Sequence, residues 1–326
     1  MRTLSLLPAF KEKFPEAEIH WITKSSSSSL FEGNPYVSKV HVLPHIPKET
    51  FDALYNFDID QPATELAQSI QAEKKYGFYA ESGFAAAYNM GAEYYLNTLF
   101  DDGIKKENKK TYQQMMFDVA ELQYKGEHCT IFLNKEDEHY AIEFLKTHNI
   151  TKKRLIGIHM GASPRWPSKV WHPSHVKEFI KQAKEKGYEI LLFAGPDEIS
   201  EQKQMIEDMT LDKIKVHANN PHNTIKQFSS LVDKCNVMVC CDSLALHIAL
   251  ALKKFTIGLF FCTPPNEVES YGLLVKLVAP KLYEFFPEKM DQYNEELVKS
   301  ITPSQVMHKI QSIAGETNKN HQFAIV

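Results

Sequence analysis

The stretch Val237–Leu252, VMVCCDSLALHIALAL, has the pattern of a buried strand, a tight turn and a buried helix. Its first five residues form a short apolar run, which is typical of a strand inside a sheet. Asp242 and Ser243 are favourable N-cap residues, and the segment after them is apolar on almost every face. The pattern therefore predicts an open α/β sheet with a helix beginning at the carboxyl end of a strand, where such sheets bind ligands.

The first turn of this predicted helix suits an anion, because its N–H groups are unpaired and carry partial positive charge. His247 lies one helical turn after Ser243 and is expected to face the same site. A structural interpretation is also open, since Asp-Ser is a common cap and a lone histidine on a helix is usually structural. These residues alone do not decide between the two.

A second stretch, Leu155–Trp171 with the sequence LIGIHMGASPRWPSKVW, predicts a strand at Leu155–His159 followed by a loop. Lys169 ends that loop just before a predicted helix at Pro173–Lys186. A cation in this position would meet a diphosphate. The alternative is a solvated lysine beside a packing tryptophan.

Composition limits the classes of protein. Hydrophobic residues make up 43% and charged residues 24% of 326 residues, the net charge is −4, and the five cysteines lack paired CxxC spacing. These values fit a soluble globular chain in a reducing cytoplasm and argue against a general nucleic-acid binder. We expect no membrane span and no signal peptide. Motifs of dinucleotide oxidoreductases, P-loop enzymes, serine hydrolases and zincins do not occur.

The second half of the chain alternates between predicted strands and helices, which indicates a parallel sheet covered on both faces. The first half follows the same scheme less clearly. We expect domains at 1–150 and 151–326, with the boundary at Asn149–Arg154. Ser25–Ser29 and Lys105–Lys110 are predicted loops. Asp58-Ile59-Asp60 is interpreted as a turn and helix cap, and not as a metal site.

Several short motifs follow one another along the second half of the chain. They are the G-A-S loop with K-x-W, the D-S-x-x-x-H junction, and Phe260–Pro264 after the next strand. They resemble glycosyltransferase family 9, the heptosyltransferases of lipopolysaccharide core assembly and their relatives. The N-terminal run RTLSLLPAFKEKFPEAEIHWIT and the later FEGNPYVSKV resemble the same family. The resemblance extends from Arg2 to about Gln311.

The resemblance implies an α/β fold of two Rossmann-like domains facing a cleft, the glycosyltransferase B fold. The N-terminal domain would be the acceptor side and the C-terminal domain would bind the nucleotide sugar. The implied reaction transfers a sugar, heptose in the best-known members, from a donor such as ADP-heptose to a lipopolysaccharide-core or related glycan hydroxyl. Inversion, no metal and no cofactor are implied. The expected location is cytoplasmic, and peripheral contact with the inner face of the membrane is left open.

The resemblance also implies roles for individual residues. Lys169 would supply charge to the diphosphate, and N–H groups over Asp242–Ala245 with the Ser243 hydroxyl would cradle it. Glu198 is a weaker candidate for the ribose hydroxyls, and a helix first-turn acid is an equal alternative. The expected donor-binding set is Ser163, Lys169, Asp242, Ser243, Leu244, Ala245, His247 and Thr263.

The chain departs from the family pattern in three places. Leu244 and Cys262 stand where the family has glycine, which suggests an altered or weakened donor pocket. The first strand and a G-D motif, whose aspartate is the expected base, would lie before Met1. Glu12 and Glu16 are not convincing substitutes for that base. A truncated or mis-started sequence, a catalytically inactive nucleotide-sugar-binding homologue, and a nucleotide-sugar epimerase on the same fold remain alternatives.

Overall fold

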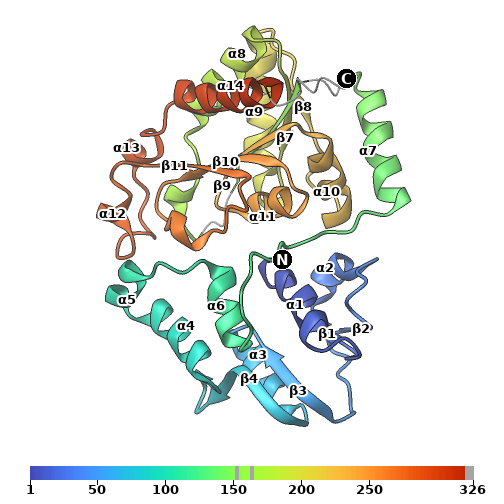
Figure 1. Ribbon diagram of the computed structural model, residues 1–326. Coiled ribbons are helices and arrows are strands. Elements are labelled where there is room, and N and C mark those ends of the chain that lie inside the picture. The colour runs from blue at the N-terminus through green and yellow to red at the C-terminus, as the bar shows by residue number, and fades with distance from the viewer. Residues whose placement is uncertain (151–153, 162–164, 320–326) are drawn as a thin grey trace, which may run out of the picture. The chain divides into compact units, whose positions relative to one another are not determined.

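The computed structural model describes residues 1–150, 154–161 and 165–319, and the chain forms two compact units (Figure 1). One unit contains Met1–Phe132 with Asn266–Glu269, and the other contains Leu133–Pro265 and the chain from Ser270 onward. The expected boundary at residue 150 therefore falls inside the second unit. The reason is that helix α7 (Lys135–Thr147) packs against helix α10 (Ile225–Lys234), so it belongs with the second unit.

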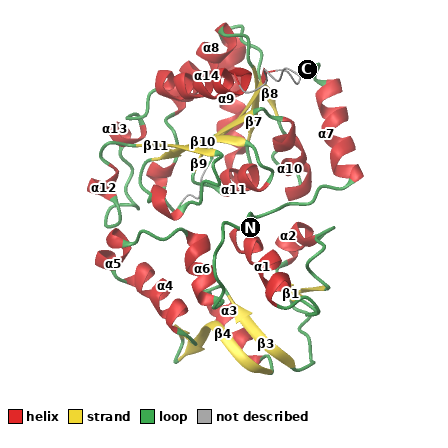
Figure 2. Ribbon diagram, in the orientation of Figure 1, coloured by secondary structure: helices red, strands yellow, loops and turns green. Residues whose placement is uncertain are grey.

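The second unit is built on a six-stranded parallel sheet with the order β11-β10-β9-β6-β7-β8 (Figure 2). Strand β9 is central and all five of its residues are buried. Its Val239 is paired with Ile158 on one side and Ile257 on the other, which explains its uninterrupted apolar sequence. The strands are β6 (Leu155–His159), β7 (Glu189–Phe193), β8 (His217–Ala218), β9 (Val237–Cys241), β10 (Phe255–Phe260) and β11 (Leu274–Val278).

Helices cover both faces of this sheet, with α8, α9 and α14 on one face and α10 and α11 on the other (Figure 1). This arrangement confirms the predicted α/β fold class. Besides α7 and α10, the helices are α8 (Pro173–Glu185), α9 (Ile199–Leu211), α11 (Leu244–Ala251), α12 (Leu282–Phe285), α13 (Glu295–Val298) and α14 (Pro303–Lys319). Short 3-10 helices are η4 (Pro167–Lys169), η5 (Pro196–Glu198) and η6 (Pro265–Glu267).

The first unit contains two separate small sheets. β1 (His20–Thr23) pairs in parallel with β2 (Lys39–Val42). In the other sheet, β3 (Phe51–Asn56) is parallel to β4 (Ala72–Glu81), and β5 (Phe84–Ala87) is antiparallel to β4. The two sheets share no strand pairing within the described residues. The helices of the first unit pack around a hydrophobic core that includes Leu6, Phe10, Phe78, Met115, Met116 and Phe117.

The helices of the first unit are η1 (Arg2–Ser5), α1 (Leu6–Lys13), α2 (Ser25–Ser28), η2 (Ser29–Phe31), α3 (Gln61–Ser69), α4 (Met90–Phe100), α5 (Asp102–Glu107) and α6 (Tyr112–Val119). Two predictions were wrong. The serine run forms the one-turn helix α2, which packs against β2, and Lys105 to Glu107 complete α5, whose N-cap is the side chain of Asp101. Across the described chain, no helix combines the length and apolar character needed to cross a membrane.

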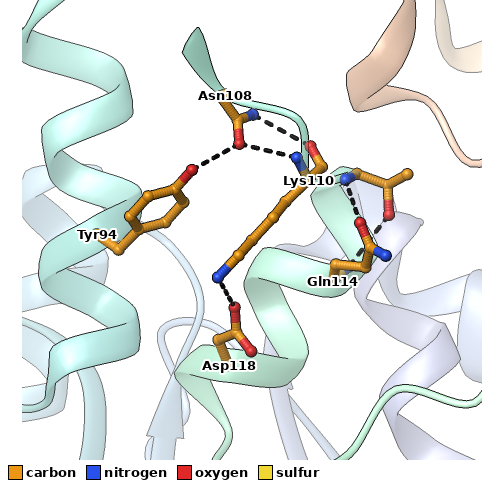
Figure 3. Close-up of polar contacts among 6 residues, drawn as sticks. Tyr94, Asn108, Lys110, Gln114 and Asp118 are labelled. Atoms are coloured by element: carbon orange, nitrogen blue, oxygen red, sulfur yellow. Dashed lines mark hydrogen bonds and ion pairs between the residues drawn. The ribbon is translucent and has the colours of Figure 1, made fainter. Parts of the chain in front are cut away.

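A polar network joins the segment between α5 and α6 to helix α4 (Figure 3). The Tyr94 hydroxyl donates to Asn108 Oδ1 over 2.8 Å, and Lys110 Nζ lies 2.7 Å from Asp118 Oδ2. Thr111 caps α6 in a capping box with Gln114. These contacts fix the start of α6. The segment just before α6, which the sequence suggested to be a solvated loop, is therefore only partly solvated.

Candidate functional site

Three neighbouring strands of the second unit bring polar residues to one edge of the sheet. β6, β9 and β10 are adjacent and parallel, so their carboxyl ends meet at the same edge. His159 is the last residue of β6, Asp242 and Ser243 follow β9, and Thr263 follows β10. The sheet topology therefore gathers residues that are far apart in the sequence.

The carboxylate of Asp242 lies between two cationic or potentially cationic groups. Lys169 Nζ is 2.9 Å from Asp242 Oδ2, and His247 Nε2 is 3.8 Å from Asp242 Oδ1. The three side chains are only 15%, 18% and 14% exposed for Lys169, Asp242 and His247. His247 is in the first turn of α11, where side chains lean toward the helix N-terminus. The structure thus brings together the three charged or titratable residues that the sequence predicted.

Lys169 is held in place by the residues on either side of it. The Ser168 hydroxyl donates to the Gln292 carbonyl and accepts from the Asn294 N–H, both over 2.8 Å. Trp171 is buried, and its indole N–H donates to the Ile301 carbonyl over 2.9 Å. Trp171 is therefore a packing residue, as the structural interpretation expected. Lys169, in contrast, is a positioned cation and not a freely solvated one.

Helix α11 begins just after Ser243, and the side chain of this residue does not cap the helix. Ser243 occupies the N-cap position but makes no side-chain capping hydrogen bond within the described structure. Its hydroxyl instead lies 3.5 Å from His159 Nδ1. Burial lowers the pKa of His159 to about 4, so this imidazole is neutral at neutral pH. The N–H groups of the first turn have no intrahelical acceptor, which is the arrangement that favours an anion.

Leu244 and Ala245 differ in exposure although they are adjacent. Leu244 is 51% exposed at the first turn of α11, whereas Ala245 is buried. A large apolar side chain thus stands at the helix end that the sequence assigned to phosphate.

Thr263 carries a buried hydroxyl for which the described residues offer no hydrogen-bond partner. An unpaired buried hydroxyl costs about 1–3 kcal/mol, so such groups usually meet a ligand or water. The neighbouring Cys262 is different, because burial raises the pKa of its thiol to about 11. Burial likewise raises the pKa of Cys241 to about 12. These thiols are protonated at neutral pH and are not nucleophiles.

Glu198 makes the contacts of a first-turn acid. Its carboxylate Oε2 accepts the Gly195 N–H over 2.7 Å. A Cβ at Gly161 would be 2.1 Å from Glu198 Oε1. Burial raises the pKa of Glu198, and the Gly195 N–H partly opposes that change. These contacts support the structural alternative, and a ribose contact remains a prediction.

The remaining expectations have different outcomes. Ser163 lies outside the described residues, and the aspartate base expected before Met1 stays a prediction. The Asp58–Asp60 segment forms the predicted turn, in which Asp58 Oδ1 accepts the Asp60 N–H over 2.9 Å. Asp60 occupies the N-cap of α3 without a side-chain capping bond. The sequence interpretation missed His159, although its place at the end of a strand beside β9 was a usable signal.

The fold and this cluster agree with a comparison to known families. Residues 45–317 match the family model described as glycosyltransferase family 9 (heptosyltransferase). The chain belongs to glycosyltransferase family 9. This result confirms the family that the motifs resemble.

Curated relatives match over part of their length. Lipopolysaccharide heptosyltransferase 2 of Salmonella typhimurium is 23% identical over 170 residues, which is 51% of this chain and 48% of the relative. The Escherichia coli K12 protein of the same name is 22% identical over 167 residues, covering 50% and 47%. The match thus spans about half the length of these curated relatives.

Solved structures share the fold over nearly the whole chain. The glycosyl transferase family 9 protein of Veillonella parvula DSM 2008 has a TM-score of 0.77 at 18% identity, covering 97% of this chain and 93% of its own. The E. coli ADP-heptose lps heptosyltransferase II has a TM-score of 0.68 at 16% identity, covering 97% and 95%. E. coli heptosyltransferase WaaC with ADP has a TM-score of 0.58 at 14% identity, covering 96% and 93%.

Proposed function

We propose that this family 9 chain is a glycosyltransferase that moves a sugar, heptose, from a nucleoside-diphosphate donor to a hydroxyl of lipopolysaccharide core or a related glycan. The observation that carries the proposal is the Lys169–Asp242–His247 cluster at the start of α11. The Thr263 hydroxyl, which has no partner among the described residues, follows the adjacent strand β10. The relatives' names support the donor class, since WaaC was solved with ADP and with ADP-2-deoxy-2-fluoro heptose.

In this proposal the second unit binds the donor. The Lys169 ammonium and the first-turn N–H groups of α11 would stabilise the diphosphate as negative charge develops on it. The Thr263 hydroxyl would donate a hydrogen bond, and so would His247. Asp242 carries the wrong charge to bind phosphate through its carboxylate. It would act instead by positioning Lys169 and His247, which it contacts directly.

The proposed reaction is a single displacement with inversion. The acceptor oxygen attacks the anomeric carbon, the bond from that carbon to the diphosphate oxygen breaks, and the acceptor proton goes to a base. No residue of this sequence is assigned as that base. Protein cations would balance the leaving group's charge, so we propose that the transfer needs no metal ion. Excess EDTA is then expected to leave the rate unchanged.

The proposal places the protein in the cytoplasm, with peripheral contact at the inner face of the membrane as part of the hypothesis. The donor would be made by a nucleotidyl transfer to a sugar phosphate, and the acceptor would be a growing glycolipid. Fractionation of cells in low and high salt tests this location. Recovery outside the cytoplasmic and inner-membrane fractions would contradict it.

A second candidate function is nucleotide-sugar binding without transfer. Leu244 favours it, because a half-exposed leucine stands at the first turn of α11 where the family pattern has glycine. The test incubates the full chain with ADP-heptose and a lipopolysaccharide acceptor, and measures ADP release and acceptor mass. Transfer requires both ADP and a heptose-sized mass increase. Binding without either product supports the silent binder, and an isomerised donor supports an epimerase.

A further inference from the structure

A cluster of potential metal ligands lies in the first unit and includes no residue of the proposed donor site. His20 is the first residue of β1, His41 lies in β2, and Glu49 lies in the segment that leads to β3. In the parallel register His41 is opposite Ile22. Because alternate residues of a strand share a face, His20 and His41 project from the same face of the sheet.

The ligand atoms of these three residues converge. His20 Nδ1 is 3.3 Å from His41 Nε2 and 3.4 Å from Glu49 Oε1, and all three ligand atoms lie within 4.8 Å of one another. His20 Nδ1 carries at most one proton. It therefore cannot accept a hydrogen bond from His41 and also donate one to Glu49. A cation among the three atoms would remove this conflict.

The spacing fits a particular kind of cation. Zinc binds imidazole nitrogen and carboxylate oxygen at about 2.0–2.2 Å in tetrahedral geometry, so neighbouring ligand atoms are roughly 3.3–3.5 Å apart. Two of the three separations here have that value. We propose that His20, His41 and Glu49 form a binding site for a divalent transition-metal ion of the Zn²⁺ class, with water as the fourth ligand.

The surroundings hold the His20 side chain in place. The ring of Phe51 packs edge-on against His20 at 5.3 Å between centroids, and the His20 side chain is only 15% exposed.

Two further charged groups set the strength of the site. Glu18 Oε2 lies 3.9 Å from His20 Nε2, where a carboxylate can orient a metal-bound imidazole. Lys39 Nζ lies 3.9 Å from Glu49 Oε1 and opposes a second cation. A bound ion would join β1, β2 and the 43–50 segment, so the proposed role is structural.

The test titrates the tag-free full chain with Co²⁺, followed by the visible absorption of four-coordinate cobalt, and then displaces Co²⁺ with Zn²⁺. We expect one equivalent to bind. His41→Ala should weaken binding about 100-fold and Glu49→Gln about 10-fold, since even outer-sphere partners change metal affinity 10–100-fold. Lys39→Ala should strengthen it a few-fold. His45→Ala is the matched control, because His45 is exposed on the same segment and outside the cluster.

Thermal unfolding with and without Zn²⁺ gives a second measurement on the same variants. The wild type and His45→Ala should gain the same shift in Tm, and His41→Ala should gain none. Circular dichroism of each variant without metal checks the fold. Cobalt binding that is equal in the wild type, His41→Ala and Glu49→Gln would overturn the proposal, as would absence of saturable binding to the wild type.

Discussion

Replacing Lys169 with alanine tests the proposed donor site most specifically. The Lys169 ammonium is positioned 2.9 Å from Asp242 Oδ2 and would make a charge-assisted hydrogen bond to the diphosphate. Hydrogen bonds to charged groups contribute about 1.5–3 kcal/mol. Since 1.4 kcal/mol is a factor of ten in affinity, the Kd for ADP should rise roughly 10- to 150-fold.

The assay is calorimetric titration of ADP into the full chain at fixed ionic strength. Asp242→Ala should also weaken binding, because it releases both Lys169 and His247 from their positions. Lys181→Ala is the control: it also breaks a lysine–aspartate contact, 3.0 Å from Asp212, but on the exposed surface of α8. Urea unfolding separates binding from folding. Unchanged ADP affinity in both site variants, with the fold intact, would show that the donor site is elsewhere.

Three further predictions concern individual groups. Thr263→Val should leave the free protein as stable as the wild type or about 1 kcal/mol more stable, because the Thr263 hydroxyl is buried without a partner among the described residues. The same substitution should weaken ADP binding. Urea unfolding measures the first effect and calorimetry the second. Gly161→Ala should destabilise the protein by about 1–3 kcal/mol, because the new Cβ would be 2.1 Å from the Glu198 carboxylate. Adding Glu198→Ala should restore part of that stability, as measured by urea unfolding. The pKa of His159 is lowered to about 4 in the folded protein, so as the pH drops from about 6.5 to 4 this imidazole becomes protonated in the unfolded chain before it does in the folded one. The free energy of unfolding should therefore fall over this range. A His159→Gln variant whose stability has the same pH profile as the wild type would contradict this.

The elements that the sequence predicted well have strong local signals. The strands at Leu155–His159 and Val237–Cys241 have the same bounds in the structure. Each is a short run dominated by apolar or β-branched and aromatic residues with a turn or cap at its end. The predicted strand-to-helix junction at Asp242 and Ser243 was also correct, because N-cap residues mark where a helix begins.

Other elements depend on contacts between distant residues. The attachment of α7 to the second unit rests on long-range packing, including the Tyr140 hydroxyl, which lies 2.6 Å from Asn223 Nδ2. The β4–β5 hairpin was missed although Ser82-Gly83, both with positive φ, is a recognisable turn pair. Strand β11 was also missed, although four of the five residues in its sequence LVKLV are apolar; it lies at the edge of its sheet and none of its residues is fully buried.

The candidate sites show the same division. Lys169, Asp242 and His247 were predicted from motifs, but the ion pair between Lys169 and Asp242 follows only from the fold. The His20–His41 pairing depends on a strand register that the sequence alone does not specify. The sequence therefore identified residue types and edges of the sheet, and the structure determined which side chains meet.

The central claim is that a nucleoside diphosphate binds at the start of α11. A crystal structure of the full chain with ADP tests it most directly. The account predicts the diphosphate within hydrogen-bond distance of Lys169 Nζ, the Thr263 hydroxyl and the first-turn N–H groups of α11. ADP bound at full occupancy away from all three would contradict the account.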